Sequence, residues 1–166
     1  MTKVILHVED DENDVLLFEH ALNKAGVDSP VHVVSNGRQA IEYFKGEGKF
    51  SNREAFPLPG LVLLDLKLPL VPGLEVLKWI RQQAELSIPV IILTSSENEE
   101  DMQAAYELCA NAYLVKPNEV TKLAAVATAI KDFWLTLNCF PAEPRPFPCL
   151  AASERKAAQP GKASRK

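Results

Sequence analysis

The stretch Leu61–Pro69, with the sequence LVLLDLKLP, most strongly constrains the fold of this chain. Its first four residues are apolar without polar alternation, which is typical of a strand buried on both faces of a parallel sheet. Asp65 follows them directly, and open α/β sheets bind ligands at the carboxyl ends of their strands. Pro69 and the Pro72-Gly73 pair then interrupt the chain before the next helical pattern. We therefore predict a carboxylate at the end of a rigid central strand, facing a loop.

Strand and helix patterns alternate along the chain. Besides the run before Asp65, the predicted strands are Lys3–Val8, Val31–Val34, Pro89–Leu93 and Ala112–Val115. The predicted helices are Asn13–Ala25, Arg38–Lys45, a segment with Leu74, Val76, Leu77 and Ile80, Glu99–Cys109, and Val120–Asn138, whose apolar stripe ends at Trp134 and Leu137. Gly46–Gly60 is predicted as a long polar loop. This alternation predicts an α/β fold, a flavodoxin-like (βα)5 three-layer sandwich with a doubly wound five-stranded parallel sheet in the order 2-1-3-4-5.

Charge divides the chain into two parts. Residues 1–138 carry a net charge of −8 and residues 139–166 carry +4, within a total of −4. We predict one folded domain over 1–138 and a Pro-rich, basic, flexible tail over 139–166. The tail could contact nucleic acid or a membrane, although a solubilising role is favoured. Because the body is acidic and the short tail cannot form a helix-turn-helix domain, we expect no direct DNA binding.

Composition also bears on the cellular location. No apolar stretch approaches the ~20 residues of a membrane-spanning helix, so we expect no membrane association. The three cysteines, Cys109, Cys139 and Cys149, have no CxxC spacing and indicate neither a disulfide framework nor a zinc site. We therefore predict a cytoplasmic protein.

The chemistry of the chain lies at its strand ends. The first predicted strand ends in Glu9-Asp10, the third in Asp65, the fourth in Thr94 and the fifth in Lys116. In a parallel sheet these ends share one edge, so the side chains should converge there. Two or three carboxylates suit Mg²⁺, and an aspartate can attack a phosphoryl group to form an aspartyl phosphate. A hydroxyl and an ammonium beside it would bind the phosphoryl oxygens.

These residues, in this order and spacing, resemble the receiver domain of two-component response regulators over about Thr2–Asn138. The resemblance implies that Asp65 is the phosphoacceptor and that Lys116 and the switch hydroxyl of Thr94 bind the phosphoryl group. It also implies that Tyr113 is the aromatic switch residue.

The same resemblance implies a Mg²⁺ site. Its ligands would be Glu9, Asp10, Asp65 and the backbone carbonyl of Lys67. A cis bond is usual in the family between the residues that match Lys116 and Pro117. The protein would accept phosphate without being a turnover enzyme.

A narrower resemblance points to a partner. The loop GEGKFSNREAFP, the segment SSENEEDMQAAYELCANAYLVKPN and the helix end KDFWLTLN are similar to the small regulators paired with bacterial phytochrome histidine kinases. This resemblance implies that the partner is a histidine kinase of the phytochrome type. It also implies that the protein forms a homodimer. We expect the dimer to form through the face of the fourth helix, fifth strand and fifth helix. Phe133, Trp134 or Leu135 would lie in the interface, with Phe140–Pro148 nearby.

Two alternatives remain open from the residues. One is an aspartate-nucleophile phosphatase. Such enzymes carry a DxD motif on the first strand, whereas the candidate nucleophile here, Asp65, follows the third predicted strand, and the residue two positions later is Lys67. The other is a receiver-like interaction module that is not phosphorylated. The complete set of strand-end residues argues against the second alternative.

Overall fold

The computed structural model of the protein describes residues 4–82 and 86–139. Five parallel strands form one sheet in the order β2-β1-β3-β4-β5, which confirms the predicted topology. The strands are β1 (Ile5–Val8), β2 (Val31–Val34), β3 (Leu61–Leu64), β4 (Val90–Thr94) and β5 (Ala112–Val115). The α-helices are α1 (Glu12–Lys24), α2 (Gly37–Lys45), α3 (Gly73–Gln82), α4 (Glu99–Glu107) and α5 (Val120–Ile130). A 3-10 helix, η1 (Gly48–Phe50), and a π-helix, η2 (Lys131–Leu137), complete the described elements.

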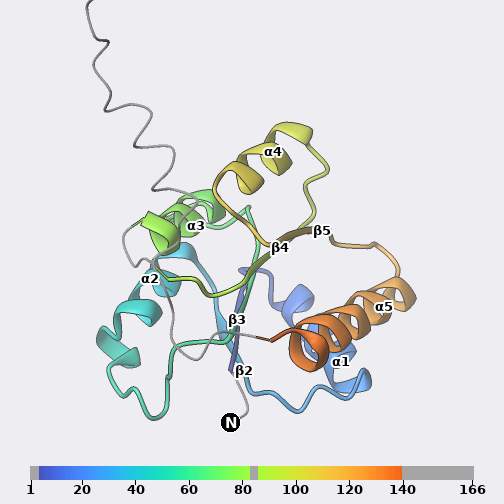
Figure 1. Cartoon of the computed structure of the whole chain (residues 1–166), viewed down its shortest axis with the longest axis horizontal. Coiled ribbons are helices and arrows are strands. Elements are labelled where there is room, and N and C mark those ends of the chain that lie inside the picture. The colour runs from blue at the N-terminus through green and yellow to red at the C-terminus, as the bar shows by residue number, and fades with distance from the viewer. Residues whose placement is uncertain (1–3, 83–85, 140–166) are drawn as a thin grey trace, which may run out of the picture.

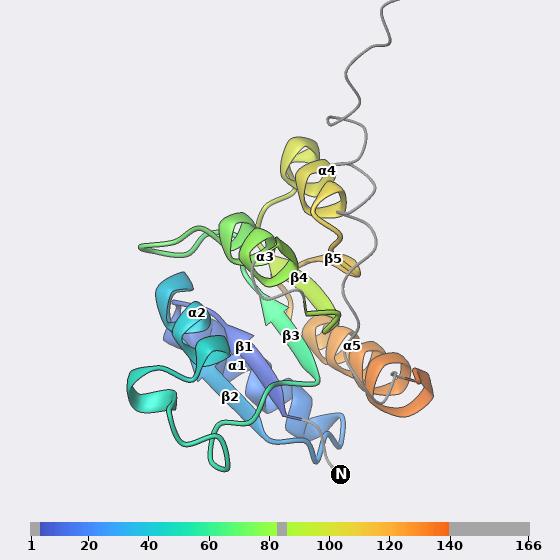
Figure 2. The same cartoon turned by 60° about the vertical axis from the view of Figure 1, so that its left-hand side comes forward.

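The helices cover the sheet in two layers. Helices α1 and α5 pack against each other on one face, and α2 and α3 pack together on the other, with α4 beside α3 (Figures 1 and 2). This is the predicted three-layer sandwich. Across the described ranges, no helix has both the length and the apolar character needed to cross a membrane.

Alternate residues of the central strands face opposite helix layers, as the two-residue period of a strand requires. On the α1/α5 side, Ile5, Leu63 and Ile91 pack with Phe18, Leu22, Leu123 and Ile130. On the α2/α3 side, Leu6, Val62 and Ile92 pack with Tyr43, Phe44, Leu77 and Ile80. Burial on both faces explains why the strand sequences are apolar without alternation.

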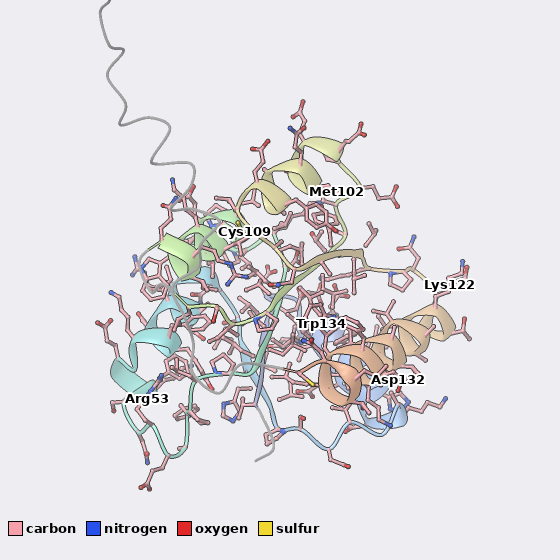
Figure 3. All side chains as sticks on the ribbon, in the orientation of Figure 1. Arg53, Met102, Cys109, Lys122, Asp132 and Trp134 are labelled. Atoms are coloured by element: carbon pink, nitrogen blue, oxygen red, sulfur yellow. The ribbon has the colours of Figure 1, made fainter. Side chains whose placement is uncertain are left out.

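The loop between α2 and β3 is packed more closely than its polar sequence predicts. Phe50 is only 3% exposed and lies with Phe56 around the ring of Tyr43. The Tyr43 hydroxyl donates a hydrogen bond to the Pro57 carbonyl at 2.9 Å. Arg53, labelled in Figure 3, donates to the Tyr43 carbonyl at 2.7 Å. The buried Phe50 and the partly buried Phe56 therefore fix the path of this loop.

The last predicted helix changes character halfway. An α-helix over Val120–Asn138 was expected to bury both Trp134 and Leu137, but α5 ends at Ile130 and the π-helix η2 follows. In η2 the N–H of Asn138 donates to the carbonyl of Phe133, five residues back, at 2.7 Å. This wider turn changes the phase of the side chains. Trp134 still packs against the core, whereas Leu137 is 72% exposed, so the prediction for Leu137 was wrong.

Candidate functional site

Three carboxylates meet at the carboxyl edge of the sheet, where the sequence places them. Glu9 follows β1 and is buried, Asp10 is exposed, and Asp65 follows β3 and is buried. One ligand oxygen from each of the three lies within 4.8 Å of the others. Carboxylate oxygens are the ligands that hard divalent cations prefer, and the exposed Asp10 leaves room for water ligands. The donor set therefore fits a divalent metal ion.

Lys116 binds this acidic group from the end of β5. Its Nζ donates to Asp65 Oδ2 at 3.0 Å and forms an ion pair with Glu9 Oε2. Burial lowers the pKa of Lys116, but its hydrogen bonds to carboxylates outweigh this effect and hold the pKa above its usual value. The side chain is therefore an ammonium at neutral pH, fixed beside Asp65.

Lys116 has a third carboxylate partner that the sequence analysis did not identify. Asp14, in the first turn of α1, accepts a hydrogen bond from Lys116 Nζ through Oδ2 at 2.9 Å. Asp14 lies four residues after Asp10, about one helical turn, so it falls near the same edge of the sheet. This spacing was the only signal in the sequence, and it did not reveal a partner more than one hundred positions away.

Burial also acts on Glu9. Because the side chain is removed from solvent, the pKa of Glu9 is raised above its usual value, although the hydrogen bond from Lys116 opposes this shift. One cationic partner only partly offsets the free-energy cost of removing a charged carboxylate from water. A divalent cation bound at the same oxygens would favour the ionised form.

The predicted switch residues are linked through Ser96. Thr94, at the end of β4, is fully buried, and its Oγ1 accepts a hydrogen bond from the N–H of Ser96 at 3.3 Å. The Tyr113 hydroxyl donates to the Ser96 carbonyl at 3.1 Å. Ser96 Oγ itself donates to Asp101 at 2.6 Å. A movement of Thr94 would therefore reach Tyr113 through the backbone of one residue.

Lys67 contacts Asp65 through its backbone N–H and Ser95 through its side chain, and the sequence indicated neither contact. Its N–H donates to Asp65 Oδ1 at 3.2 Å, and its Nζ lies 3.4 Å from Ser95 Oγ. The role of its carbonyl as a metal ligand stays a prediction.

The expected cis bond between Lys116 and Pro117 is absent, since the described residues contain no cis peptide bond.

Gly73 explains how α3 can begin directly beside Asp65. A Cβ atom at Gly73 would lie 2.0 Å from the carbonyl oxygen of Asp65, a distance that no side chain tolerates. The Gly73 N–H donates to the carbonyl of Leu66 at 3.0 Å. Glycine therefore allows the helix to brace the loop that follows the central strand.

His7 makes the stability of this region depend on pH. It is 2% exposed, and its Nδ1 has no hydrogen-bond partner in the described part of the chain. Burial lowers the pKa of His7 from 6.5 to about 4, and Lys116 adds to the effect. The unfolded chain therefore takes up a proton at a higher pH than the folded chain does. We expect the free energy of unfolding to fall by up to about 3 kcal/mol as the pH decreases from about 6.5 to about 4.

Urea denaturation at about pH 7 and about pH 5 would measure this dependence. His7→Leu should remove the contribution of His7, whereas His20→Gln, at an exposed position of α1, should leave it in place. An identical pH dependence in wild type and His7→Leu would contradict the prediction.

Known proteins share this fold. The response regulator receiver domain family matches residues 5–128. Response regulator Rcp1 of Synechocystis sp. is 39% identical over 141 residues, which cover 84% of this chain and 94% of Rcp1. The crystal structure of the Mn²⁺-bound form of Rcp1 matches with a TM-score of 0.76 over 84% of this chain and 99% of that chain.

Two further structures belong to regulators named for phytochromes. The phosphorylated cyanobacterial phytochrome response regulator RcpA is 34% identical, with a TM-score of 0.76 over 86% of this chain and 100% of that chain. The bacteriophytochrome response regulator RtBRR is 43% identical, with a TM-score of 0.66 over 95% of this chain and 92% of that chain. These similarities do not favour a phosphatase or an unphosphorylated interaction module. The chain therefore belongs to the receiver-domain family of two-component response regulators and resembles its phytochrome-associated members.

Proposed function

We propose that Asp65 accepts a phosphoryl group from a histidine kinase in a Mg²⁺-dependent reaction. The observation that carries this proposal is the contact of Lys116 Nζ with Asp65, beside the three-carboxylate group of Glu9, Asp10 and Asp65. This combination offers a nucleophile, a cation for the phosphoryl oxygens and ligands for a metal ion. The receiver would extend over residues 1–138 and act as a phosphoacceptor and not as a turnover enzyme.

The transfer needs little covalent chemistry from the protein. A carboxylate oxygen of Asp65 forms a bond to phosphorus while the bond from phosphorus to the histidine nitrogen of the kinase breaks, and that nitrogen keeps the electron pair. Lys116 and the hydroxyl of Thr94 bind phosphoryl oxygens. Mg²⁺ held by Glu9, Asp10, Asp65 and the carbonyl of Lys67 would neutralise negative charge on the phosphoryl group.

The relatives suggest the type of kinase. Two similar structures are described as phytochrome or bacteriophytochrome response regulators, and a third, 30% identical, as a regulator in red light signalling of R. palustris. These names support our proposal that the phosphodonor is a phytochrome-type histidine kinase. We also propose that the protein acts in the cytoplasm. Phosphotransfer from a panel of purified histidine kinases would test the pairing, and fastest transfer from a kinase without a phytochrome sensor would contradict it.

Phosphorylation itself can be tested with a small acyl phosphate. Wild-type protein with Mg²⁺ should gain one phosphoryl group, labile to hydroxylamine, in intact-mass spectra. A chelator should prevent the gain because the carboxylates alone would repel the phosphodonor. Unchanged labelling in the presence of the chelator would contradict the metal dependence.

We also propose a homodimer through the face of α4, β5 and α5. Phe133 is 53% exposed and stacks edge-on with Trp134, whereas Trp134 and Leu135 partly pack on the core. Tyr106 on α4 is also exposed. Exposed aromatic residues are common anchors of symmetric interfaces. The segment Phe140–Pro148, expected nearby, lies outside the described residues.

Sedimentation should show a dimer of wild type that the double variant Phe133→Ala/Leu135→Ala weakens. Leu58→Ala, at an exposed leucine in the loop before β3, serves as the matched control and should leave the dimer unchanged. Phosphorylation should tighten the dimer by about 1–3 kcal/mol, since it adds about −1.5 to −2 charges at Asp65 and shifts Thr94 and Tyr113. A monomer at tens of micromolar in both phosphorylation states would contradict the proposal.

A further inference from the structure

Lys116 is held by one carboxylate more than the predicted site supplies. An ammonium group has three N–H donors. Here they go to Glu9, to Asp65 and to Asp14, the last through Oδ2 at 2.9 Å. The side chain of Lys116 is 14% exposed, so these contacts and not solvent determine where its charge lies.

Asp14 differs from the other two partners because it is not part of the metal-binding group. The group found in the described ranges consists of Glu9, Asp10 and Asp65. A divalent cation and a phosphoryl group bound at the site would compete with Lys116 for the oxygens of Glu9 and Asp65. The oxygen of Asp14, which lies outside that group, can stay with Lys116.

Asp14 is also not used to cap its own helix. It is the third residue of α1, where an acidic side chain commonly reaches back to the N–H of the N-cap residue. That N–H, from Asp11, donates instead to Glu9 Oε1 at 3.2 Å. Asp11 caps the helix through its own Oδ1, which accepts from the N–H groups of Asn13 and Asp14. The carboxylate of Asp14 is thereby left for Lys116.

Lys116 has room to move if the contact with Asp14 is lost. A cavity of about 50 Å³ lies beside its side chain, between α1 and the start of α5. Its lining includes Asp14 and Lys116 together with the apolar Leu17, Phe18 and Leu123. This space is sufficient for water, which could take the third N–H of the ammonium in place of Asp14.

We propose that Asp14 is a positioning residue that keeps the ammonium of Lys116 beside Asp65 while the phosphoryl group is transferred. The inference rests on the proposed role of Asp65 as phosphoacceptor. It adds a fourth carboxylate, from α1, to the residues that determine the rate of phosphorylation.

Two substitutions separate the position of Lys116 from the charge of Asp14. Asp14→Ala removes the acceptor, so phosphorylation by an acyl phosphate at saturating Mg²⁺ should slow by about five- to tenfold. Asp14→Asn keeps an acceptor oxygen at the same place, and its rate should stay within about twofold of wild type. Both variants lose one negative charge, so their dissociation constants for Mg²⁺, measured calorimetrically, should rise by a similar factor of about two to three.

Glu12→Ala is the matched control. Glu12 lies in the same first turn of α1, is exposed and does not contact Lys116, so its removal should leave the rate unchanged. Circular dichroism would establish that all variants are folded. Labelling of wild type and its absence in Asp65→Asn test the acceptor separately. With wild type labelled, an Asp14→Ala variant that reacts at the wild-type rate would overturn the inference, and so would equal slowing of Asp14→Ala and Asp14→Asn.

Discussion

Asp65→Asn protein is expected to gain no phosphoryl group from either a histidine kinase or an acyl phosphate in the presence of Mg²⁺. An amide cannot replace the carboxylate as nucleophile, so the bond to phosphorus does not form. Asparagine has nearly the same volume, and its Oδ1 can still accept the hydrogen bond from the N–H of Lys67. Intact-mass spectrometry should therefore show complete loss of labelling in a folded protein.

The stability of this variant should change little. The substitution removes the charge-assisted contact with Lys116, but it also removes one of three neighbouring negative charges, and these effects oppose each other. We expect the free energy of unfolding to stay within about 1 kcal/mol of wild type.

Asp10→Asn is the informative comparison for Asp65→Asn. It keeps the nucleophile and weakens the metal site, so its labelling should slow and recover at higher Mg²⁺ concentration. Labelling that survives in Asp65→Asn would place the phosphoacceptor at another residue and contradict the assignment.

The sequence predicted those parts of the fold that depend on local pattern and on general rules of topology. The apolar run before Asp65 and the four similar runs marked all five strands, because the strands of a covered parallel sheet are mostly apolar. Since parallel strands end at one edge, the convergence of Glu9, Asp65 and Lys116 followed without any distance being known. The structure places Lys116 in contact with both carboxylates.

Features that depend on contacts between distant segments were not predictable in this way. Asp14 had the pattern of an ordinary acidic residue at a helix N-terminus, and only the position of β5 shows its contact with Lys116. Likewise, Phe50 and Phe56 lay in a stretch rich in glycine and polar residues, and their burial depends on Tyr43 of α2. The π-helix after Ile130 could not be distinguished from an α-helix, because the spacing of the apolar residues in Lys131–Leu137 is also compatible with a continued α-helix.

Arg81 is a further buried residue that its sequence pattern did not reveal. It lies four residues after Leu77 on the buried side of α3 and is only 2% exposed. Its guanidinium donates to the carbonyls of Leu86 and Ile88, both at 2.9 Å, and to the carbonyl of Cys109. It also donates to Asn111 Oδ1 at 2.9 Å. One side chain thus joins α3, the approach to β4, the end of α4 and the start of β5.

Arg81→Met is expected to lower the free energy of unfolding by about 3–5 kcal/mol, the second large effect that we predict. Methionine has a similar length but no donor, so three carbonyl groups and an amide oxygen would lose their hydrogen bond from the guanidinium. Burial lowers the pKa of Arg81 to about 10, which still leaves the side chain charged at neutral pH. Arg81→Lys should not restore the stability, because a single ammonium cannot reach four acceptor atoms spread over the segments before β4 and before β5.

Urea denaturation with an unchanged m-value would measure this loss, with Lys78→Met as the control. Lys78 lies on the exposed side of the same helix, and its replacement should change the free energy of unfolding by less than about 0.5 kcal/mol. A loss below about 1 kcal/mol in Arg81→Met would mean that water replaces the guanidinium without penalty.

Because Arg81 connects the end of α4 to the start of β5, its loss should also loosen the face proposed for the dimer. Amide hydrogen exchange should therefore accelerate in α4 and β5 of Arg81→Met before it does so in β1 and β3, which lie further from the guanidinium in the sheet.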